Sequence, residues 1–177
     1  KNRMLDYSII DAAKILEMAG GPLSPLFSKI MQNDTGFDPR VDTIIYEEEM
    51  GISGWYGPAM NIHRTAFSGS NFENYSEDGV LSGAMAANAI AGAQEHGVYA
   101  YMKHFALNDC EQDRIGLGVW LNEQAAREVY LKAFQAPVEV GNGNGVMIAY
   151  TRWGAVWSGG NYGLVTGILR NEWGCDG

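Results

Sequence analysis

Polar residues that could bind a ligand follow three apolar runs of the sequence. Each run has the composition of a buried strand, and the carboxyl ends of parallel strands are where α/β folds build their sites. Taken singly, each residue also has a structural interpretation: a loop hydrogen bond, a solvated ammonium or a core ring. Their coincidence at three strand ends favours a shared site. The residues are Asn61, His63 and Arg64 after the first run, Lys103 and His104 after the second, and Tyr150 and Arg152 after the third.

Helical periodicity and turn residues predict the elements that must position these side chains. Asn122 can cap the helix that follows the second strand, Pro137 should kink its last turn, and Gly141 should end it. The expected elements are helices over 6–19, 24–31 and 42–50, a strand in the passage that opens at 51, a helix within 76–97, a strand over 98–102 that ends at Lys103, a helix over 123–140, a strand over 145–150 and a helix over 162–173.

Apolar strands that alternate with helices indicate an α/β fold with a parallel sheet covered by helices. Periodicity leaves two architectures open, an open doubly wound sheet and a (β/α) barrel. The GNGNG run at 141–145 precedes a strand, so its polarity is wrong for a phosphate loop and it is typical of a helix-ending turn. The sequence therefore lacks the phosphate-binding motif that an α/β nucleotide-binding enzyme needs.

Composition excludes several classes of protein. The net charge is −9 with no basic stripe, which argues against a nucleic-acid partner, and no run of about 18 apolar residues could span a bilayer. Cys110 and Cys175 are too few for a disulfide framework and lack zinc-ligand spacing, so we expect free thiols and no metal. The opening residues carry no signal-peptide pattern. The compartment stays open, with the cytoplasm as the first expectation.

Several motifs together resemble glycoside hydrolase family 3, a family that contains many β-glucosidases. The stretch YMKHFALND resembles its KHF segment, and the similarity extends over 51–177 in the order of the family. The other motifs are GPAMNIHRTAFSGSNFENYSEDGVLSG, LNEQAAREVYLKAF, VMIAYTRWG and LVTGILRNEWGCDG.

The resemblance implies a partial (β/α)8 TIM-type barrel, incomplete at its C-terminal end, with the N-terminal end left open. A complete barrel needs about 250 residues. We therefore expect two regions, a poorly matched helical segment at 1–50 and a partial barrel domain at 51–177. The implied activity is that of a retaining, exo-acting β-glycosidase that hydrolyses terminal non-reducing sugars without a cofactor or metal. The alternative is a catalytically inactive carbohydrate-binding or structural remnant of that fold.

The resemblance also implies roles for the residues at the strand ends. Lys103 and His104 would hydrogen-bond the sugar hydroxyls, and Tyr150 would border the anomeric centre and orient the nucleophile. His63 and Arg64, with Asn61, would shape the neighbouring loop, and the SED run at 76–78 would begin the helix that supports it. For Glu73 we expect a carboxylate that pins the loop rather than an acid catalyst.

Two departures from the family pattern bear on activity. Ser70 stands where the family commonly has arginine, which should weaken sugar binding by about 1–3 kcal/mol if that arginine contacts substrate. The nucleophilic Asp and the acid/base Glu of the family fall outside the matched positions. Asp176 precedes the nucleophile strand, and Asp109, Glu111 and Asp113 do not match the acid/base position.

These departures lead to two expectations, one for the activity of the isolated chain and one for its partners. We expect the isolated chain to be inactive, because both carboxylates of the reaction are missing from it. Half a barrel exposes strand edges and apolar faces, so its partners should be the remainder of the barrel and a second domain, or a second copy of itself.

Overall fold

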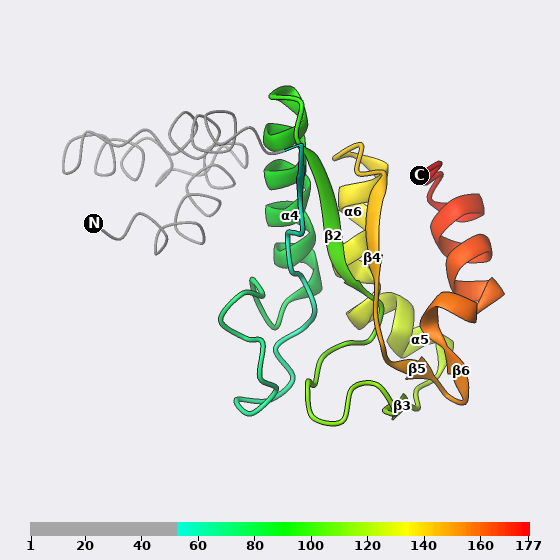
Figure 1. Cartoon of the computed structure of the whole chain (residues 1–177). Coiled ribbons are helices and arrows are strands. Elements are labelled where there is room, and N and C mark those ends of the chain that lie inside the picture. The colour runs from blue at the N-terminus through cyan, green and yellow to red at the C-terminus, as the bar shows by residue number, and fades with distance from the viewer. Residues whose placement is uncertain (1–52) are drawn as a thin grey trace.

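The computed structural model describes residues 53–177 and shows an α/β arrangement (Figure 1). The predicted segment 1–50 lies outside the described residues, and so do the three helices predicted within it, over 6–19, 24–31 and 42–50. The elements are, in order, β1 (Gly54–Trp55), α4 (Gly79–Glu95), β2 (Tyr99–Phe105), β3 (Gly118–Val119), α5 (Glu123–Ala125), η2 (Ala126–Tyr130), α6 (Lys132–Glu139), β4 (Gly145–Ile148), β5 (Arg152–Trp153), β6 (Val156–Trp157), η3 (Ser158–Gly160) and η4 (Gly163–Glu172).

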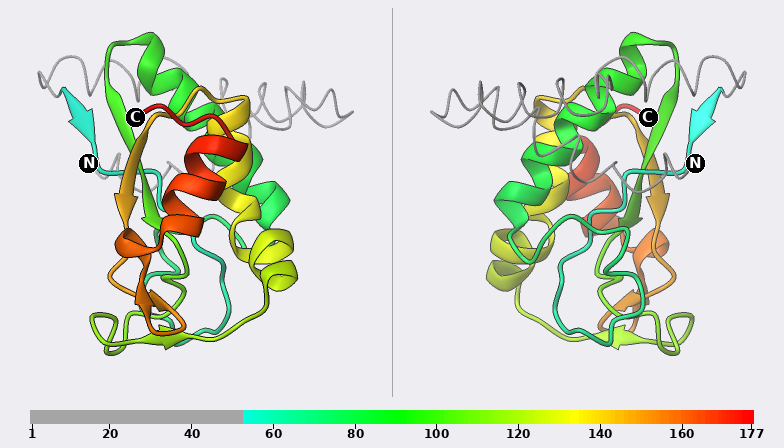
Figure 2. Two further views of the ribbon diagram at one scale, coloured as in Figure 1. Left: turned by 90° about the vertical axis from the view of Figure 1, so that its right-hand side faces the viewer. Right: turned by 90° about the vertical axis from the view of Figure 1, so that its left-hand side faces the viewer.

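The central sheet is parallel, with strand order β1-β2-β4. Figure 2 shows α4, α6 and η4 on one side of this sheet, and within residues 53–177 no element covers the other side. Along β2 the side chains of Ala100 and Met102 are buried against the helices, whereas Tyr99 on the alternate face is exposed. Because the three strands run in parallel, their carboxyl ends and the loops that follow lie at one end of the molecule (Figure 1).

Helix α4 begins and packs as its composition predicts. The Asp78 side chain caps it by accepting hydrogen bonds from the backbone N–H groups of Val80 and Leu81. Its small residues let η2 and α6 approach closely: a Cβ added at Gly79 would come within 2.8 Å of the Val129 carbonyl oxygen of η2, and one at Gly83 within 3.2 Å of the Ala133 carbonyl oxygen of α6. Close helix contact is therefore the reason that this helix is rich in glycine and alanine.

The predicted helix over 123–140 forms as three successive segments, α5, η2 and α6. Asn122 caps it, since its side chain accepts a hydrogen bond from the Ala125 N–H at 2.8 Å. Segment η2 is a π-helical turn, and Pro137 lies inside α6. The GNGNG run then ends the helix, with Gly143 N–H donating to the Pro137 carbonyl, and leads into β4. The interpretation of that run as a turn is confirmed.

The last predicted helix is also present, as the π-helical segment η4. It ends where Gly174 adopts a φ of +79°, a backbone conformation that glycine reaches without strain. Its buried residues Leu164, Ile168 and Leu169 join the core, and Phe105 of β2 packs edge-on against Phe134 and Trp173.

A second, small sheet with strand order β3-β5-β6 was not predicted. Each of its strands has two residues, too few to produce a hydrophobic period. It turns at Gly154, whose φ is +62°, and lies at the carboxyl end of the central sheet (Figure 1). This sheet holds the chain that follows Tyr150 against the loop that follows β2.

Two predicted strand boundaries were wrong. Lys103 and His104 lie inside β2, because its pairing with β4 continues to Phe105 and the backbone N–H and carbonyl of Lys103 bond to Pro58 and Met60 on the other side. From residue 53 onward, the passage predicted as the first strand forms a two-residue strand, β1. Pro58 has no N–H to donate, and the chain continues beside β2 through an isolated bridge at Ala59.

Candidate functional site

Two consecutive residues of β2 present cationic and imidazole side chains at the end of the central sheet. The Lys103 Nζ atom lies 2.8 Å from a carboxylate oxygen of Glu73, and both side chains are largely shielded from solvent. Glu73 belongs to the loop that precedes α4, so this ion pair ties that loop to β2. The contact agrees with the expectation that Glu73 pins its loop.

The backbone of His104 is held by the buried side chain of Asn61. The two residues exchange a pair of hydrogen bonds, one through each atom of the Asn61 amide group. The Asn61 side chain is only 2% exposed. Asn61 therefore acts on the site through His104, and the structure brings together two residues that the sequence placed on different strand ends.

The loop after Asn61 is fixed by Asp109, which follows β2. The Ile62 N–H donates to Asp109 Oδ1 at 2.7 Å, and His63 Nε2 lies 2.9 Å from the Asn74 carbonyl oxygen. Burial raises the pKa of Asp109 to about 6, although the Ile62 hydrogen bond and the charge of Arg64 partly oppose it. Arg64 is exposed and stacks over the Tyr130 ring at 5.5 Å. Arg64 and His63 thus contact their own surroundings rather than Lys103.

Glu111 is the most connected carboxylate at this end of the sheet. It accepts hydrogen bonds from Ser70 Oγ (3.0 Å), Asn108 Nδ2 (2.7 Å) and Arg114 Nη1 (2.5 Å). Partial burial acts to raise the pKa of Glu111, but these three donors outweigh it and hold the pKa below its ordinary value. The carboxylate is therefore charged at neutral pH.

Tyr150 follows β4 and meets the loop after β2. Its ring faces the Arg114 guanidinium, whose Cζ atom lies 5.0 Å from the ring centroid. The neighbouring Thr151 is fully buried and its hydroxyl donates to the Ala106 carbonyl oxygen at 3.1 Å, which fixes the backbone next to Tyr150. Arg152 points toward its own turn, with a weak contact to the Ala155 carbonyl oxygen at 3.4 Å, and does not join this group.

Four charged groups act on the pKa of His104. Burial lowers the pKa of His104, and the charge of Lys103 lowers it further. Glu111 and Glu73 oppose this effect, and Arg114 adds to it. Charges from the end of β2, from the loop before α4 and from the loop after β2 therefore act on one imidazole, which stays neutral at pH 7.

Sequence reasoning did not single out Arg114 or Asn108 and gave Glu111 no role. The Glu111 and Arg114 pair, three residues apart, was the available signal, but it lies in a loop where no helical rule applies. The contacts that link this pair to the rest of the site are made by Ser70 and Tyr150, which are distant from it in sequence. The structure therefore links Tyr150 to Ser70 through Arg114 and Glu111, which the sequence left without a role.

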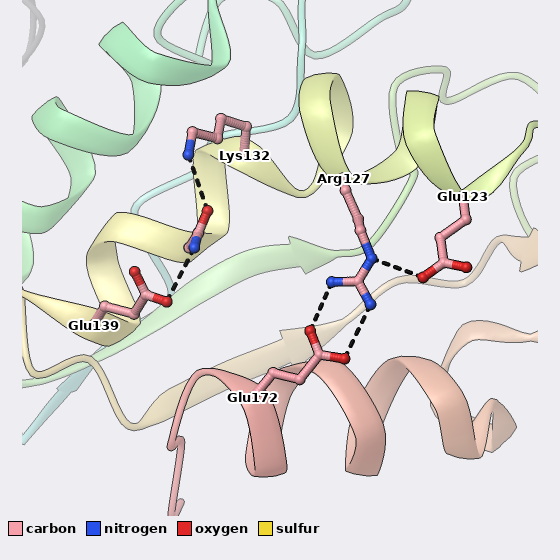
Figure 3. Close-up of polar contacts among 6 residues, drawn as sticks. Glu123, Arg127, Lys132, Glu139 and Glu172 are labelled. Atoms are coloured by element: carbon pink, nitrogen blue, oxygen red, sulfur yellow. Dashed lines mark hydrogen bonds and ion pairs between the residues drawn. The ribbon is translucent and has the colours of Figure 1, made fainter.

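A groove of about 520 Å³ lies elsewhere, on the helical layer between α4, η2, α6 and η4. Arg127 in this groove binds Glu123 and Glu172 (Figure 3). Gln135 forms hydrogen bonds with Lys132 and Glu139. None of the residues predicted for the site lines it. Among residues 53–177 no cluster of His, Cys, Asp and Glu could hold a metal ion, and no helix is long and apolar enough to cross a membrane.

The sequence model of the glycosyl hydrolase family 3 N-terminal domain matches residues 43–177. The chain belongs to this family. Curated relatives of family 3 include beta-glucosidase A of Butyrivibrio fibrisolvens, 38% identical over 156 residues, which are 88% of this chain and 19% of the relative. Another is the probable beta-glucosidase I of Neosartorya fischeri, 41% identical over 146 residues, which are 81% of this chain and 17% of the relative.

Solved structures agree with this assignment. Beta-glucosidase 3B from Thermotoga neapolitana in complex with glucose superimposes with a TM-score of 0.78 at 32% identity, covering 98% of this chain and 21% of that chain. The resemblance to glycoside hydrolase family 3 and the α/β fold class are thus confirmed. The chain spans about a fifth of the length of these relatives.

Proposed function

We propose that this family 3 chain supplies part of the sugar subsite of a retaining, exo-acting β-glycosidase that resembles β-glucosidases. The observation that carries the proposal is geometric: Lys103, paired with Glu73, and His104, held by Asn61, lie at the end of the sheet where the Tyr150 ring meets Arg114. Glu73, Lys103, His104 and Tyr150 belong to the motifs that resemble the family, whereas Glu111 and Arg114 lie between two of them. The parallel sheet would be the corresponding part of a (β/α)8 barrel, with the region 51–177 as its domain segment.

In this proposal Lys103 and His104 hold the sugar from the end of β2. The Lys103 ammonium has three donors, and Glu73 uses one side of it, so the others can bind hydroxyl oxygens. A neutral His104 can both donate to and accept from a hydroxyl group. Tyr150 would lie beside the anomeric carbon, and Asn61, His63 and Arg64 would support the loop next to it.

The bond-breaking carboxylates come from elsewhere in this proposal. Retaining hydrolysis needs two carboxyl groups about 5–5.5 Å apart, one to attack the anomeric carbon and one to protonate the leaving oxygen. The nearby carboxylates Glu73, Asp109 and Glu111 each accept a hydrogen bond or ion pair from the protein. They therefore suit structural roles, and turnover would require the nucleophile strand and the following domain of the family.

Ser70 favours the second candidate function, an inactive carbohydrate-binding or structural remnant. Its hydroxyl donates to Glu111, so it contributes one neutral donor where the family pattern has a charged fork of donors. Such a remnant would keep the half-site but bind sugar weakly or not at all.

The deciding experiment compares two products of the same coding sequence with an aryl β-glucoside as substrate: the 177-residue chain and one extended through the next strand and domain. We expect turnover from the longer product only, lost in Lys103→Ala and in His104→Ala. Lys132→Ala is the matched control, because this lysine lies on the helical layer and binds Gln135. Turnover by the 177-residue chain would refute the proposal that the two catalytic carboxylates lie outside it.

Titration of the longer product with gluconolactone separates the two candidates. Binding without turnover would favour the carbohydrate-binding remnant, and cooperative folding without binding would favour a structural remnant. Equal loss of activity in Lys132→Ala and Lys103→Ala would refute the assignment of Lys103 to the sugar subsite.

A further inference from the structure

We propose that Glu111 is a positioning residue of this site: it docks the 65–71 loop onto the loop after β2 and holds the Arg114 guanidinium against Tyr150. The inference rests on the proposed function, since Tyr150 matters to catalysis only if a sugar binds beside it. Nothing in the family pattern used above assigned a role to Glu111.

The two oxygens of the Glu111 carboxylate serve different partners. Oε1 accepts from both Ser70 and Asn108, and Oε2 accepts from Arg114. The side chain is only 20% exposed, so water cannot readily replace these donors. One carboxylate thus joins two loops that are 41 residues apart in sequence.

The backbone of Glu111 is docked as well as its side chain. Its N–H donates to the Ser68 carbonyl oxygen at 2.8 Å. Gly69 adopts a φ of +94°, and a Cβ there would come within 3.0 Å of the Glu111 Cβ. The loop therefore uses a glycine in a left-handed conformation to bring its backbone against this residue, which is the geometry of a specific contact.

Arg114 transmits this arrangement to Tyr150. The guanidinium has one carboxylate partner within the described residues, Glu111, and its other face lies over the Tyr150 ring. Tyr150 is 53% exposed, so packing alone constrains its ring only on one side. Removing the Glu111 charge should release Arg114 and with it the contact that orients the phenol.

The substitution Glu111→Gln tests the role, because no orientation of an amide satisfies all three donors. If the amide oxygen faces Ser70 and Asn108, the amide NH₂ faces the Arg114 guanidinium, donor against donor. The flipped orientation leaves Ser70 and Asn108 opposite donors instead. The size of the side chain is unchanged, so a structural effect of lost volume is avoided.

The first measurement uses NMR of the 177-residue chain without ligand. In the parent chain we expect nuclear Overhauser contacts between the Arg114 side chain and the Tyr150 ring, and upfield-shifted Arg114 protons. Both should vanish in Glu111→Gln and persist in Glu73→Gln, which removes the carboxylate that pairs with Lys103. Contacts that persist in Glu111→Gln overturn the proposal, as does their loss in both variants.

A second variant keeps the test decisive if Glu111→Gln does not fold. Ser70→Ala removes one hydroxyl donor from an exposed loop, and we expect the Glu111 amide, bonded to Ser68, to exchange its hydrogen at least several-fold faster. The Arg114 and Tyr150 contact should remain, because Oε2 is untouched. Unchanged exchange of the Glu111 amide would mean that the side chain does not dock the loop.

Gluconolactone titration of the extended product links the positioning role to the site. We expect Glu111→Gln to weaken binding at least tenfold, with Glu128→Gln on the helical layer as the control. If the Tyr150 contact is lost but neither parent nor variant binds, Glu111 positions Tyr150 and the proposed sugar function is wrong. If the parent binds and Glu111→Gln binds equally, the positioning role is wrong.

Discussion

The side chain of Asn61 forms two hydrogen bonds with the backbone of His104: Asn61 Nδ2 donates to the His104 carbonyl oxygen at 3.0 Å, and the His104 N–H donates to Asn61 Oδ1 at 2.9 Å. An amide group is the side chain that offers one donor and one acceptor in this geometry. The pair links the loop after β1 to the end of β2. It sets where the His104 imidazole can lie.

Replacing Asn61 by alanine should destabilise the chain by about 2–4 kcal/mol, because a buried N–H and a buried carbonyl lose their partners. Urea unfolding followed by circular dichroism measures the loss, and hydrogen exchange of the His104 amide reports its site. Gln124→Ala is the control: Gln124 is exposed and bonds to Glu128 on the same helical surface, so its loss should cost less than about 1 kcal/mol. Equal costs in the two variants would contradict the assigned role.

Asp109 should make stability depend on pH in an unusual direction. Its pKa is about 6 in the folded chain against an ordinary value of 3.8, so the folded state binds more protons between these values. The stability contribution of this group is present below pH 3.8 and is lost as pH rises through about 6.

The variant Asp109→Asn isolates this effect, since the amide oxygen can still accept from the Ile62 N–H. We expect it to be more stable than the parent at pH 7.5 by on the order of 1–3 kcal/mol, and the difference to shrink toward pH 4. Urea unfolding at pH 4, 5.5 and 7.5 measures the difference. A variant less stable than the parent at pH 7.5 would show that the charged carboxylate is needed by Arg64.

Arginine at position 70 should strengthen sugar binding if the proposed function is right. A gain of about 1–3 kcal/mol corresponds to an affinity for gluconolactone about 5- to 150-fold higher in Ser70→Arg, measured by calorimetry on the extended product. Thr65→Arg adds the same charge to the same loop. Equal gains in the two variants would indicate a general charge effect instead of a contact at position 70.

The ion pairs of the helical layer should contribute little. Arg127 binds Glu172 through two nitrogen atoms, at 2.7 and 3.0 Å, and Glu123 at 2.8 Å (Figure 3). Glu172 is exposed, so we expect Glu172→Gln to lower the melting temperature only slightly, with the difference abolished in 1 M NaCl. A large fall that persists at high salt would show that the pair fastens η4 to η2.

Local features of the sequence determined much of the helical part of the fold. The Asn122 cap, the helix-ending GNGNG run and the start of the last helix follow from contacts over three or four residues, which a pattern can reveal. The motif around Lys103 and His104 also identified the family without any structure. These predictions depend on residue types in a fixed local order.

Only the tertiary structure decided how the site is assembled. Asn61 and His104 are 43 residues apart, Ile62 and Asp109 are 47 apart, and Ser70 and Glu111 are 41 apart. No periodicity reports such pairs, because their geometry depends on the strand register and on loops that dock after the sheet forms. The position of Lys103 and His104 inside β2 was missed for the same reason: pairing with β4 up to Phe105 and with the 58–60 segment extends the strand, and both partners are distant in sequence.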